Sequence, residues 1–577
     1  MNDWTSTVLC KIAEKAWGTK VVRQGQCNGK VESHGEGLQG VRVHIEISLF
    51  NTLQYCSAPE KHENTILIEG EMIYREKANG LQSKIDDVFN KIAKLIPNVN
   101  VTSFKSCTNG ITSKASIINP RSQYCIGENL VIQCNMYDYL GNSKTYGGDF
   151  LRSRLYSKEL GASVSGRIED FNNGTYHIHF PLYWKGKVQV SAMLFHPSEG
   201  IAALWRSRHS SSGVLEYEGR FVNFTQDEIT ACGFKLNTDK ELCEYLDQDD
   251  EEAFYCIKPS NLSCESLNEM RSIVIRKSHL TKEETELFKS NKIGIEISKE
   301  FKFINVEDCK KHKSISLPKC ETGMESPIPS GYFYKNIWNP VYCNMTNYET
   351  GDNFTNCLQG KKLFLLGDST LRQFVMHFND IKRPLHAING HWTQIIVTNY
   401  LGFNQRNWNS WQKTLLAVNI DKDIYVFYKR HAIPLESFRF YYFKEDKYIS
   451  RQIDQLGGGM DTIIAITLGQ HFRHFPLTLY IRRVINIRRA IERLFRRSPE
   501  TKVIIKSENT REIHASVEKT GDFYGYTQYL ALREVFQGMN VGFVDAWDMT
   551  VSSATENIHP PGYTLQGIMS MTFTFAC

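Results

Sequence analysis

The sequence predicts a multidomain protein in which a β-sandwich precedes an α/β domain with a wound parallel sheet. A chain of 577 residues, 41% of them hydrophobic, can bury several cores. Apolar and polar residues alternate in segments 130–136, 176–180 and 188–194, which is typical of half-buried strands. From about residue 331 onward, short apolar runs alternate with helical segments, which is typical of α/β domains.

These patterns divide the chain into four parts. Residues 86–225 are the expected β-sandwich, residues 226–330 an acidic and cysteine-rich connector, and residues 331–577 the α/β domain. Residues 1–85 form a separate N-terminal segment. Within the α/β domain, segment 479–497 has an apolar stripe at helical spacing and arginines elsewhere. We expect it to be a solvated crossover helix; binding of an anionic donor or substrate is the less favoured interpretation.

The most informative motif is KKLFLLGDSTLRQF, residues 361–374. Its apolar run predicts a central parallel strand, and Gly367 supplies a tight turn at the carboxyl end of that strand. Open α/β sheets bind their ligands at this edge. Ser369 would then lie at the start of a helix, where unpaired backbone N–H groups can stabilise an oxyanion. The motif predicts a nucleophilic serine, and simple helix capping by Ser369 is the alternative.

A serine nucleophile needs a base, and the best candidate is His559, in a loop that follows the strand predicted at 541–544. Glu556 precedes it by three residues, so its carboxylate can fold back onto Nδ1 while Nε2 faces the serine. Asp548 is the reserve acid. The alternative for His559, which precedes two prolines, is a rigid surface turn.

Further donors are expected after the strand predicted at 463–468. Besides the Ser369 backbone N–H, the segment Gly469-Gln470-His471 is the next candidate for the oxyanion hole. Within it the Gln470 amide could be the donor, although Gln470 is equally suited to bonding a neighbouring loop. His471 and His474 suggest a zinc site. Two histidines without a Cys-x-x-Cys or His-Glu-x-x-His element lack the necessary ligands, so we expect no metal.

The order of these motifs resembles the SGNH/GDSL hydrolase superfamily, whose G-D-S block carries the nucleophile and whose D-x-x-H block carries the acid and base. It looks most like the PC-esterase branch. Together with ITLGQHFRHFP and DAWDMT through IHPP, residues 86 to 577 closely resemble the NXPE family of neurexophilin and PC-esterase domain proteins. Residues 1–85 do not resemble the family, which suggests an atypical start.

The resemblance implies an SGNH-type domain with a flavodoxin-like parallel sheet. Segments YGGDFLRSR, DFNNGTYHIHFPLYWKG and HPSEGIAALW resemble the neurexophilin-like domain, a sandwich of immunoglobulin or filamin type. Arg372 and Gln373 match positions that follow the nucleophile in similar acetyltransferases, which implies that they orient the substrate or the oxyanion. One position departs from the family pattern, because Glu556 stands where the family has Asp.

The function that the resemblance implies is acyl-ester chemistry through an acyl-serine at Ser369. Since PC-esterase relatives include glycan O-acetyltransferases, we expect acetyl transfer to a glycan or glycoprotein, with sialic acid the leading acceptor. Acetyl-CoA would be the donor, although the sequence has no recognisable motif for it. A carbohydrate or lipid esterase is the alternative. A third interpretation is a secreted ligand or adhesion module whose sandwich binds a protein partner and whose esterase domain is inactive; the Glu556 departure favours it.

Cysteines and glycosylation signals predict a protein of the secretory pathway, either secreted or in the Golgi lumen. The chain has 15 cysteines, and short spacings suggest the pairs Cys125–Cys134, Cys232–Cys243, Cys256–Cys264, Cys309–Cys320 and Cys343–Cys357. N-glycosylation sequons occur at Asn100, Asn173, Asn223, Asn261, Asn344 and Asn353. No signal peptide or transmembrane run is visible. A net charge of +5 without a basic aromatic motif does not favour nucleic acid binding.

Overall fold

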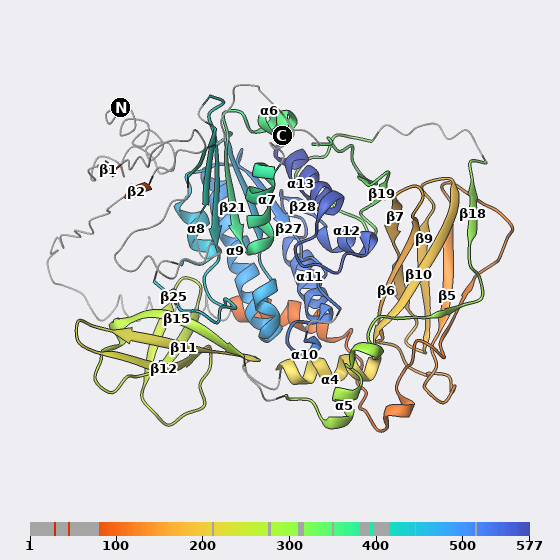
Figure 1. The fold of residues 1–577 in the computed structure, drawn as a ribbon, viewed down its shortest axis with the longest axis horizontal. Helices are drawn as coiled ribbons and strands as arrows, with labels where there is room; N and C mark the ends of the chain where they lie inside the picture. The colour runs from red at the N-terminus through yellow and green to blue at the C-terminus, as the bar shows by residue number, and fades with distance from the viewer. Residues whose placement is uncertain are drawn as a thin grey trace, which may run out of the picture.

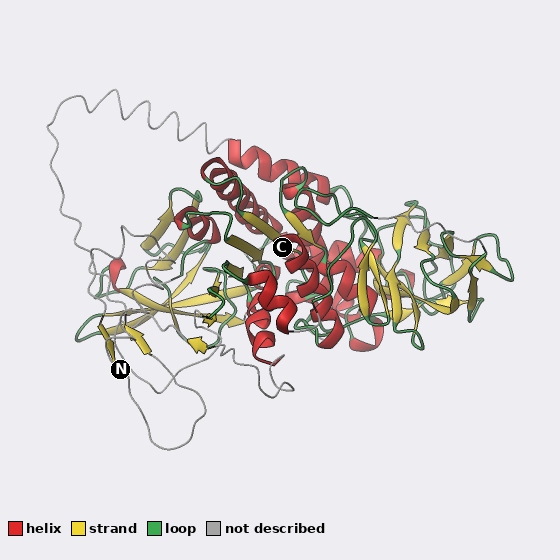
Figure 2. Ribbon diagram, turned by 90° about the horizontal axis from the view of Figure 1, so that it is seen from above, coloured by secondary structure: helices red, strands yellow, loops and turns green. Residues whose placement is uncertain are grey.

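An α/β domain occupies the centre of the molecule, with a β-sandwich on one side and a smaller antiparallel sheet on the other (Figure 1). Viewed from above, helices gather in the middle and strands lie toward both ends (Figure 2). The computed structural model describes residues 28–30, 44–46, 80–209, 213–274, 278–309, 317–348, 351–380, 393–395, 415–419, 421–444, 446–513 and 516–577.

Little of the N-terminal segment belongs to the described residues. β1 (Asn28–Lys30) and β2 (His44–Glu46) form an antiparallel pair. Cys10, Cys27 and Cys56 lie outside the described residues, as do the first 27 residues of the chain.

The sandwich consists of two sheets with the strand orders β20-β19-β7-β6-β10-β18-β4 and β17-β3-β5-β9-β8, and β16 pairs with β10. Its strands are β3 (Lys114–Ile117), β4 (Tyr124–Cys125), β5 (Asn129–Asn135), β6 (Phe150–Ser157), β7 (Ala162–Ser165), β8 (Arg167–Asp170), β9 (Thr175–Pro181), β10 (Gly186–His196), β16 (Ile295–Glu296), β17 (Ser298–Lys299), β18 (Ile304–Glu307), β19 (Gly331–Tyr334) and β20 (Ile337–Pro340). Alternate residues such as Ile132, Ile178 and Val190 form its core. The β18–β4 and β17–β3 pairs are parallel.

Residues expected to form a connector contribute to two different sheets. β16 to β18 return to the sandwich, whereas residues 227–274 help to build the smaller antiparallel sheet. That sheet has the order β13-β14-β12-β11-β15-β25, with β11 (Leu215–Val222), β12 (Asp227–Gly233), β13 (Leu242–Asp247), β14 (Glu252–Ile257), β15 (Leu267–Val274) and β25 (Tyr441–Tyr442). Its partner strand β25 comes from the α/β part of the chain, so this sheet is joined to that domain through backbone hydrogen bonds.

The central sheet has the order β22-β23-β24-β21-β26-β27-β28. Its strands are β21 (Lys362–Gly367), β22 (Thr393–Ile395), β23 (Leu415–Asn419), β24 (Ile424–Arg430), β26 (Thr462–Thr467), β27 (Lys502–Lys506) and β28 (Gly542–Val544). The five strands β24, β21, β26, β27 and β28 are parallel to one another. β23 and β22 extend the sheet beyond β24 and pair in the antiparallel sense. The predicted strand at 361–367 is therefore internal, with neighbours on both sides.

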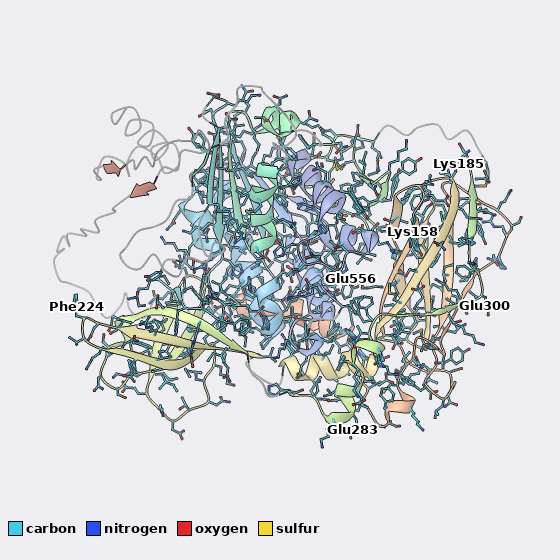
Figure 3. All side chains as sticks on the ribbon, in the orientation of Figure 1. Lys158, Lys185, Phe224, Glu283, Glu300 and Glu556 are labelled. Carbon is cyan, nitrogen blue, oxygen red and sulfur yellow. A yellow bond between two sulfur atoms is a disulfide. The ribbon has the colours of Figure 1, made fainter. Side chains whose placement is uncertain are left out.

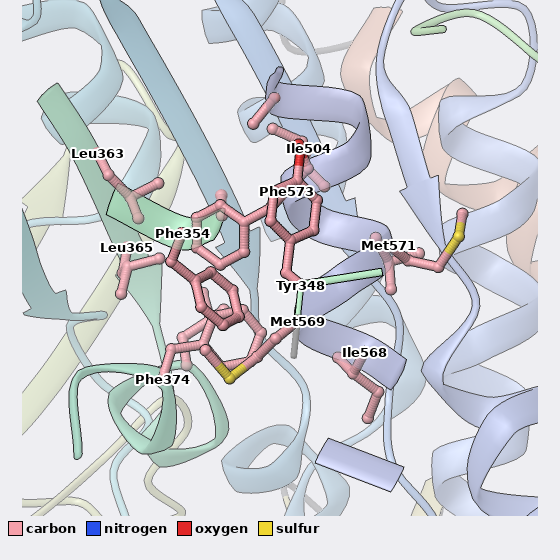
Figure 4. Packing of buried hydrophobic residues seen from close by; sticks show 14 of the residues in the cluster. Tyr348, Phe354, Leu363, Leu365, Phe374, Ile504, Ile568, Met569, Met571 and Phe573 are labelled. Atoms are coloured by element: carbon pink, nitrogen blue, oxygen red, sulfur yellow. Dashed lines mark hydrogen bonds between the residues drawn. The ribbon is translucent and has the colours of Figure 1, made fainter. Parts of the chain in front are cut away.

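Helices cover both faces of this sheet. They are α8 (Ile449–Gln455), α9 (Leu477–Arg497) and α11 (Asp522–Phe536) on one face and α6 (Gly351–Leu358), α7 (Ser369–Asp380), α12 (Ala546–Ser553) and α13 (Gly562–Ala576) on the other. The described residues also form α4 (Ser198–His209), α5 (Lys282–Glu286) and α10 (Val517–Thr520). Side chains of β21 alternate between two cores, since Phe364 and Leu366 pack with α8, α9 and α11, whereas Leu363 and Leu365 pack with α6, α7 and α13. Figure 4 shows the second core, in which Phe354 and Phe573 meet edge to face.

An additional helix over residues 80–93 packs on the first of these cores. Its side chains Leu81, Ile85 and Ile92 are buried in the cluster that contains Phe364 and Tyr480. The expected boundary at residue 86 falls inside this helix, which belongs with the α/β core by its contacts. Among the described residues, no helix is both long and apolar enough to cross a membrane.

Five disulfides connect the described cysteines, and each of the short-range pairs suggested from spacing is wrong. The bonds are Cys125–Cys309, Cys232–Cys256, Cys243–Cys264, Cys320–Cys343 and Cys357–Cys577, while Cys107 and Cys134 are free and buried. Pairing of distant strands explains the first bond: β18 lies beside β4, which brings together cysteines separated by 184 positions. So many disulfides are typical of a secreted or lumenal protein, and all six sequon asparagines are exposed.

Candidate active site

Ser369 lies at the carboxyl end of β21, at the first residue of α7. Gly367 allows the strand to turn here, because a Cβ at this residue would lie 1.9 Å from the Thr467 carbonyl oxygen. Asp368, rather than Ser369, caps the helix: its Oδ1 accepts hydrogen bonds from the Thr370 backbone N–H at 2.9 Å and from Thr370 Oγ1 at 2.7 Å. The Ser369 hydroxyl is thereby left for another partner.

That partner is His559, whose Nε2 lies 2.8 Å from Ser369 Oγ. The two residues are 190 positions apart and are joined by the fold alone. Three side chains hold the loop that carries the histidine. Gln373 Nε2 donates to the Pro560 carbonyl at 3.0 Å, Asn509 Nδ2 donates to the Ile558 carbonyl at 2.8 Å, and Glu512 Oε1 accepts from the Ile558 N–H at 3.3 Å. The serine and the imidazole therefore meet at hydrogen-bonding distance with the loop fixed on both sides.

The imidazole of His559 is suited to act as a base. Burial lowers its pKa below the usual 6.5, so the ring is neutral at pH 7 and Nε2 can accept the serine proton. The negative charges of Asp368 and Glu512 act in the opposite direction and stabilise the protonated ring. Arg372 and Lys506 add to the lowering.

Two carboxylates predicted as triad acids lie elsewhere. Glu556, labelled in Figure 3, is exposed, and its charge acts on Arg152 of β6. Within the described part of the chain, no hydrogen bond joins Glu556 to His559. The carboxylate of Asp548 accepts hydrogen bonds from Ser165 and from both the N–H and the hydroxyl of Ser330, so it links α12 to the sandwich side.

A cleft of about 440 Å³ opens above the serine, a volume suited to a small substrate. Ser369, His559 and Arg372 line it, together with residues that follow β24 and β26. A larger cavity of about 720 Å³ lies between the sandwich and the helices, but the described residues that line it include no histidine. Only the smaller cleft combines a serine with a bonded imidazole among the described residues.

The remaining predicted site residues come from two segments, α7 and the turn that follows β26. Arg372 lines the cleft, and its Nη1 has no hydrogen-bond partner among the described residues, whereas Gln373 is directed at the histidine loop. Gly469 cannot carry a side chain, since a Cβ would lie 2.0 Å from Glu508 Oε1. Gln470 is buried and donates to the Asn509 carbonyl at 3.2 Å, so its amide serves the loop.

A buried charged network supports the floor of the site. Lys506 Nζ donates to Asn509 Oδ1 at 2.9 Å and to Thr370 Oγ1 at 3.3 Å. Burial alone would raise the pKa of Asp368, but the charge of Lys506 and the hydrogen bonds from Thr370 lower it. Glu508 is also buried, and burial raises its pKa to about 8. These contacts tie the ends of β21 and β27 together beneath the serine.

The sequence did not point to three residues around the site, His431, Asn509 and Glu512, whereas His471 belongs to the Gly469-Gln470-His471 segment expected to supply an oxyanion donor. His431 and His471 line the cleft, with ring centroids 5.3 Å apart. Both follow strands that flank β21, so their positions at strand ends were the available signal. No group of three metal-binding side chains occurs in the described part of the chain.

Two family models match the chain. One, described as NXPE family member 4-like, C-terminal domain, covers residues 338–577, and the other, described as Neurexophilin, covers residues 115–273. The chain belongs to the NXPE family. In this NXPE protein the first model contains the whole cleft, and the second contains most strands of the sandwich and continues through most of β15.

Among solved structures, this NXPE protein is similar to the Escherichia coli adhesin FdeC. The identity is 13%, the match covers 35% of this chain and 65% of that chain, just under two thirds, and the TM-score is 0.13. A likeness this small carries no argument about fold or function.

Proposed function

We propose that this NXPE protein is an SGNH-type acyl-ester enzyme of the secretory pathway, acting through an acyl intermediate on Ser369. The observation that carries the proposal is the 2.8 Å contact between Ser369 Oγ and His559 Nε2 inside a cleft at the carboxyl edge of a parallel sheet. The strand order β24-β21-β26-β27-β28 supports it, since it is the doubly wound order 2-1-3-4-5, with the cleft at the switch point.

In the first half-reaction, His559 Nε2 removes the Ser369 proton as Oγ attacks the acyl carbon. A tetrahedral oxyanion forms, and the α7 N-terminus supplies the Ser369 backbone N–H toward it. The protonated imidazole then gives its proton to the leaving group, and the acyl-serine remains. In the second half-reaction, the imidazole takes a proton from water or from a sugar hydroxyl, whose oxygen attacks the acyl-serine. The bond from the acyl carbon to Oγ then breaks, and the imidazolium returns its proton to Ser369 Oγ.

The proposal assigns the carboxylate support of His559 to Glu512 and Asp368, because their charges act on its imidazole. Glu512 also accepts a hydrogen bond from the residue next to His559, which places it beside the loop. Glu556 is the acid that the family pattern expects. Replacing each of Glu512 and Glu556 by glutamine separates the two assignments: the true supporting acid, once removed, lowers turnover by orders of magnitude.

We propose O-acetyl transfer to a glycan, with sialic acid as the leading acceptor and acetyl-CoA as the donor, in the Golgi lumen or after secretion. Arg372 supports an anionic ligand, because it lines the cleft without an ion pair among the described residues. A guanidinium binds either a carboxylate, as in sialic acid, or a phosphate, as in CoA. The sandwich would position a glycoprotein or another protein partner.

Two other functions are distinguished by the same assay. A carbohydrate or lipid esterase uses the same Ser369 but passes the acyl group to water. An inactive ligand or adhesion module is favoured by one observation, the lack of a described hydrogen bond between Glu556 and His559. The close Ser369–His559 contact and the open cleft support the enzyme instead.

The experiment is incubation of the whole protein with labelled acetyl-CoA and a sialylated glycoprotein, comparing wild type with Ser369→Ala. We expect label on the glycan with the wild type and none with the variant. Hydrolysis of an aryl acetate without glycan labelling would support the esterase. Label transfer that survives the substitution, or no serine-dependent turnover of any ester, would overturn the proposal.

A further inference from the structure

His471 lies at the strand end next to the nucleophile. It follows β26, which pairs with β21 along its whole length, and it belongs to the short helix η5 (Gln470–His474). Its side chain lines the same cleft as Ser369 and His559. The sequence had suggested Gln470 as the side-chain donor from this loop, but the Gln470 amide is buried and bonded to Asn509.

The backbone around His471 fixes which ring nitrogen carries the proton. The Glu436 N–H lies 3.0 Å from His471 Nδ1, and a backbone N–H can only donate. Nδ1 must therefore be unprotonated, so the proton of the neutral ring is on Nε2. Glu436 is itself held, because its carboxylate lies 3.1 Å from His474 Nε2.

The ring stays uncharged at neutral pH. Burial lowers the pKa of His471, and the neighbouring charges of Asp368 and Glu436 only oppose this effect. His431 packs beside it with a ring-centroid distance of 5.3 Å, and burial lowers the pKa of His431 to about 3. No described residue accepts a hydrogen bond from His471 Nε2, so the cleft contains a neutral, oriented N–H donor without a protein acceptor.

We propose that His471 Nε2–H is the side-chain donor of the oxyanion hole and acts together with the Ser369 backbone N–H. This inference rests on the proposed function and deepens it. The donor bonds the acyl carbonyl oxygen of the substrate and bonds it more strongly once Ser369 Oγ has added and the oxygen carries negative charge. No proton is transferred, because the N–H of a neutral imidazole is a weaker acid than the hydroxyl that protonation of the oxyanion would form. The ring therefore remains neutral throughout.

Two variants separate this role from a structural one. In His471→Gln, the amide oxygen can accept from the Glu436 N–H while the amide nitrogen still donates into the cleft. In His471→Leu, the volume is similar but both hydrogen bonds are lost. Arg372→Met is the matched control, since it removes a different hydrogen-bond donor that lines the same cleft.

The test measures hydrolysis of 4-nitrophenyl acetate and of its thiono counterpart, in which sulfur replaces the carbonyl oxygen and accepts hydrogen bonds poorly. We expect His471→Leu to lower kcat for the oxygen ester about 10² to 10³-fold with little change in KM. The thiono ester should lose much less, so the ratio of the two rates should collapse. His471→Gln should retain part of the ratio, and Arg372→Met should leave it unchanged.

The outcomes distinguish this inference from the proposed function. Ser369-dependent turnover with an unchanged rate ratio in His471→Leu would overturn the inference alone, as would a collapse caused by Arg372→Met instead. Wild-type protein without Ser369-dependent turnover of either ester would overturn the proposed function and this inference with it. Thermal melting identifies a variant that fails to fold, and His471→Gln then provides the deciding comparison.

Discussion

Asp548 provides the sharpest contrast between a structural and a catalytic carboxylate. It lies buried on α12 and receives three hydrogen bonds, from the Ser165 hydroxyl, from the Ser330 N–H at 2.6 Å and from the Ser330 hydroxyl at 2.7 Å. Ser165 ends β7 of the sandwich, so the carboxylate joins two parts of the molecule. We predict that changing it alters stability and leaves the chemistry of each folded molecule unaffected.

The expected magnitude follows from the groups left behind. Asp548→Ala leaves one buried N–H and two hydroxyls without an acceptor, each at a cost of about 1–3 kcal/mol, so the free energy of unfolding should fall by about 3–9 kcal/mol. Asp548→Asn keeps the volume and one acceptor oxygen. It also removes a buried charge beside Asp545, so the net change should be about 1 kcal/mol or less.

Burial, followed by the charge of Asp545, raises the pKa of Asp548 from 3.8 to about 6. The fold therefore favours the protonated acid, and this contribution to stability is complete below about pH 4 and is lost as the pH rises through 6. Asparagine does not titrate. The stability of the wild type relative to Asp548→Asn should therefore decrease as the pH rises from 4 to 6.

The assay combines urea unfolding, followed by tryptophan fluorescence, with kcat for an aryl acetate at pH 7. Both Asp548 variants should retain the wild-type kcat per folded molecule. If Asp548 were the acid of the triad, even the conservative Asp548→Asn variant would lose about 10⁴-fold in kcat while remaining folded. That loss would show that Asp548 takes part in catalysis and would refute a purely structural role.

Three further predictions concern the serine, its base and the chain end. The acid limb of aryl acetate hydrolysis should have its midpoint below pH 6.5, because burial lowers the pKa of His559; a midpoint above 7 contradicts this. Gly367→Ala places a Cβ 1.9 Å from the Thr467 carbonyl, so it should cost about 1–3 kcal/mol and lower kcat, and a variant unchanged in both would refute the packing argument. Replacing both Cys357 and Cys577 by serine removes a disulfide that spans 220 positions, which should lower the free energy of unfolding by about 5 kcal/mol in the chain-entropy model. A guanidinium unfolding curve identical to that of the wild type would contradict this.

The local patterns of the sequence predicted those parts of the fold that depend on neighbouring residues. The apolar run 363–366 is an internal parallel strand because both of its faces are buried, and the stripe in segment 479–497 is the helix α9. The arginines of α9 were expected to face solvent, but several form ion pairs with acidic residues of the protein, as Arg483 does with Glu252 of β14.

Features that depend on distant segments were not accessible in the same way. The Cys125–Cys309 disulfide follows from strand pairing, because β18 lies beside β4, and neither spacing nor composition encodes that neighbour. The connector predicted from its acidity and cysteines consists of strands shared between two sheets. The acidic and cysteine content of a segment indicates that it is exposed and can form disulfides. The sheet that its strands join depends on partner strands far away in the sequence.

In the candidate active site, too, the sequence predicted what depends on neighbouring residues and did not predict what depends on distant segments. Gly367, Asp368 and Ser369 are adjacent, so a local motif was enough to place the turn and the nucleophile. The donor role of His471 depends on the Glu436 backbone, which lies on another loop, and that contact has no signature in the sequence. Glu512 approaches the histidine loop for the same reason, through the fold rather than through spacing.

The central claim is that Ser369 carries the acyl group, and mass spectrometry of the protein after brief incubation with acetyl-CoA or an aryl acetate tests it most directly. The account predicts an acetyl group on the peptide that contains Ser369 in the wild type and its absence in Ser369→Ala. The deacylation base is removed in His559→Ala, so that variant should acylate slowly and then retain the group. Turnover without any acetyl group on Ser369, or acetylation that persists in Ser369→Ala at another residue with full activity, would contradict it.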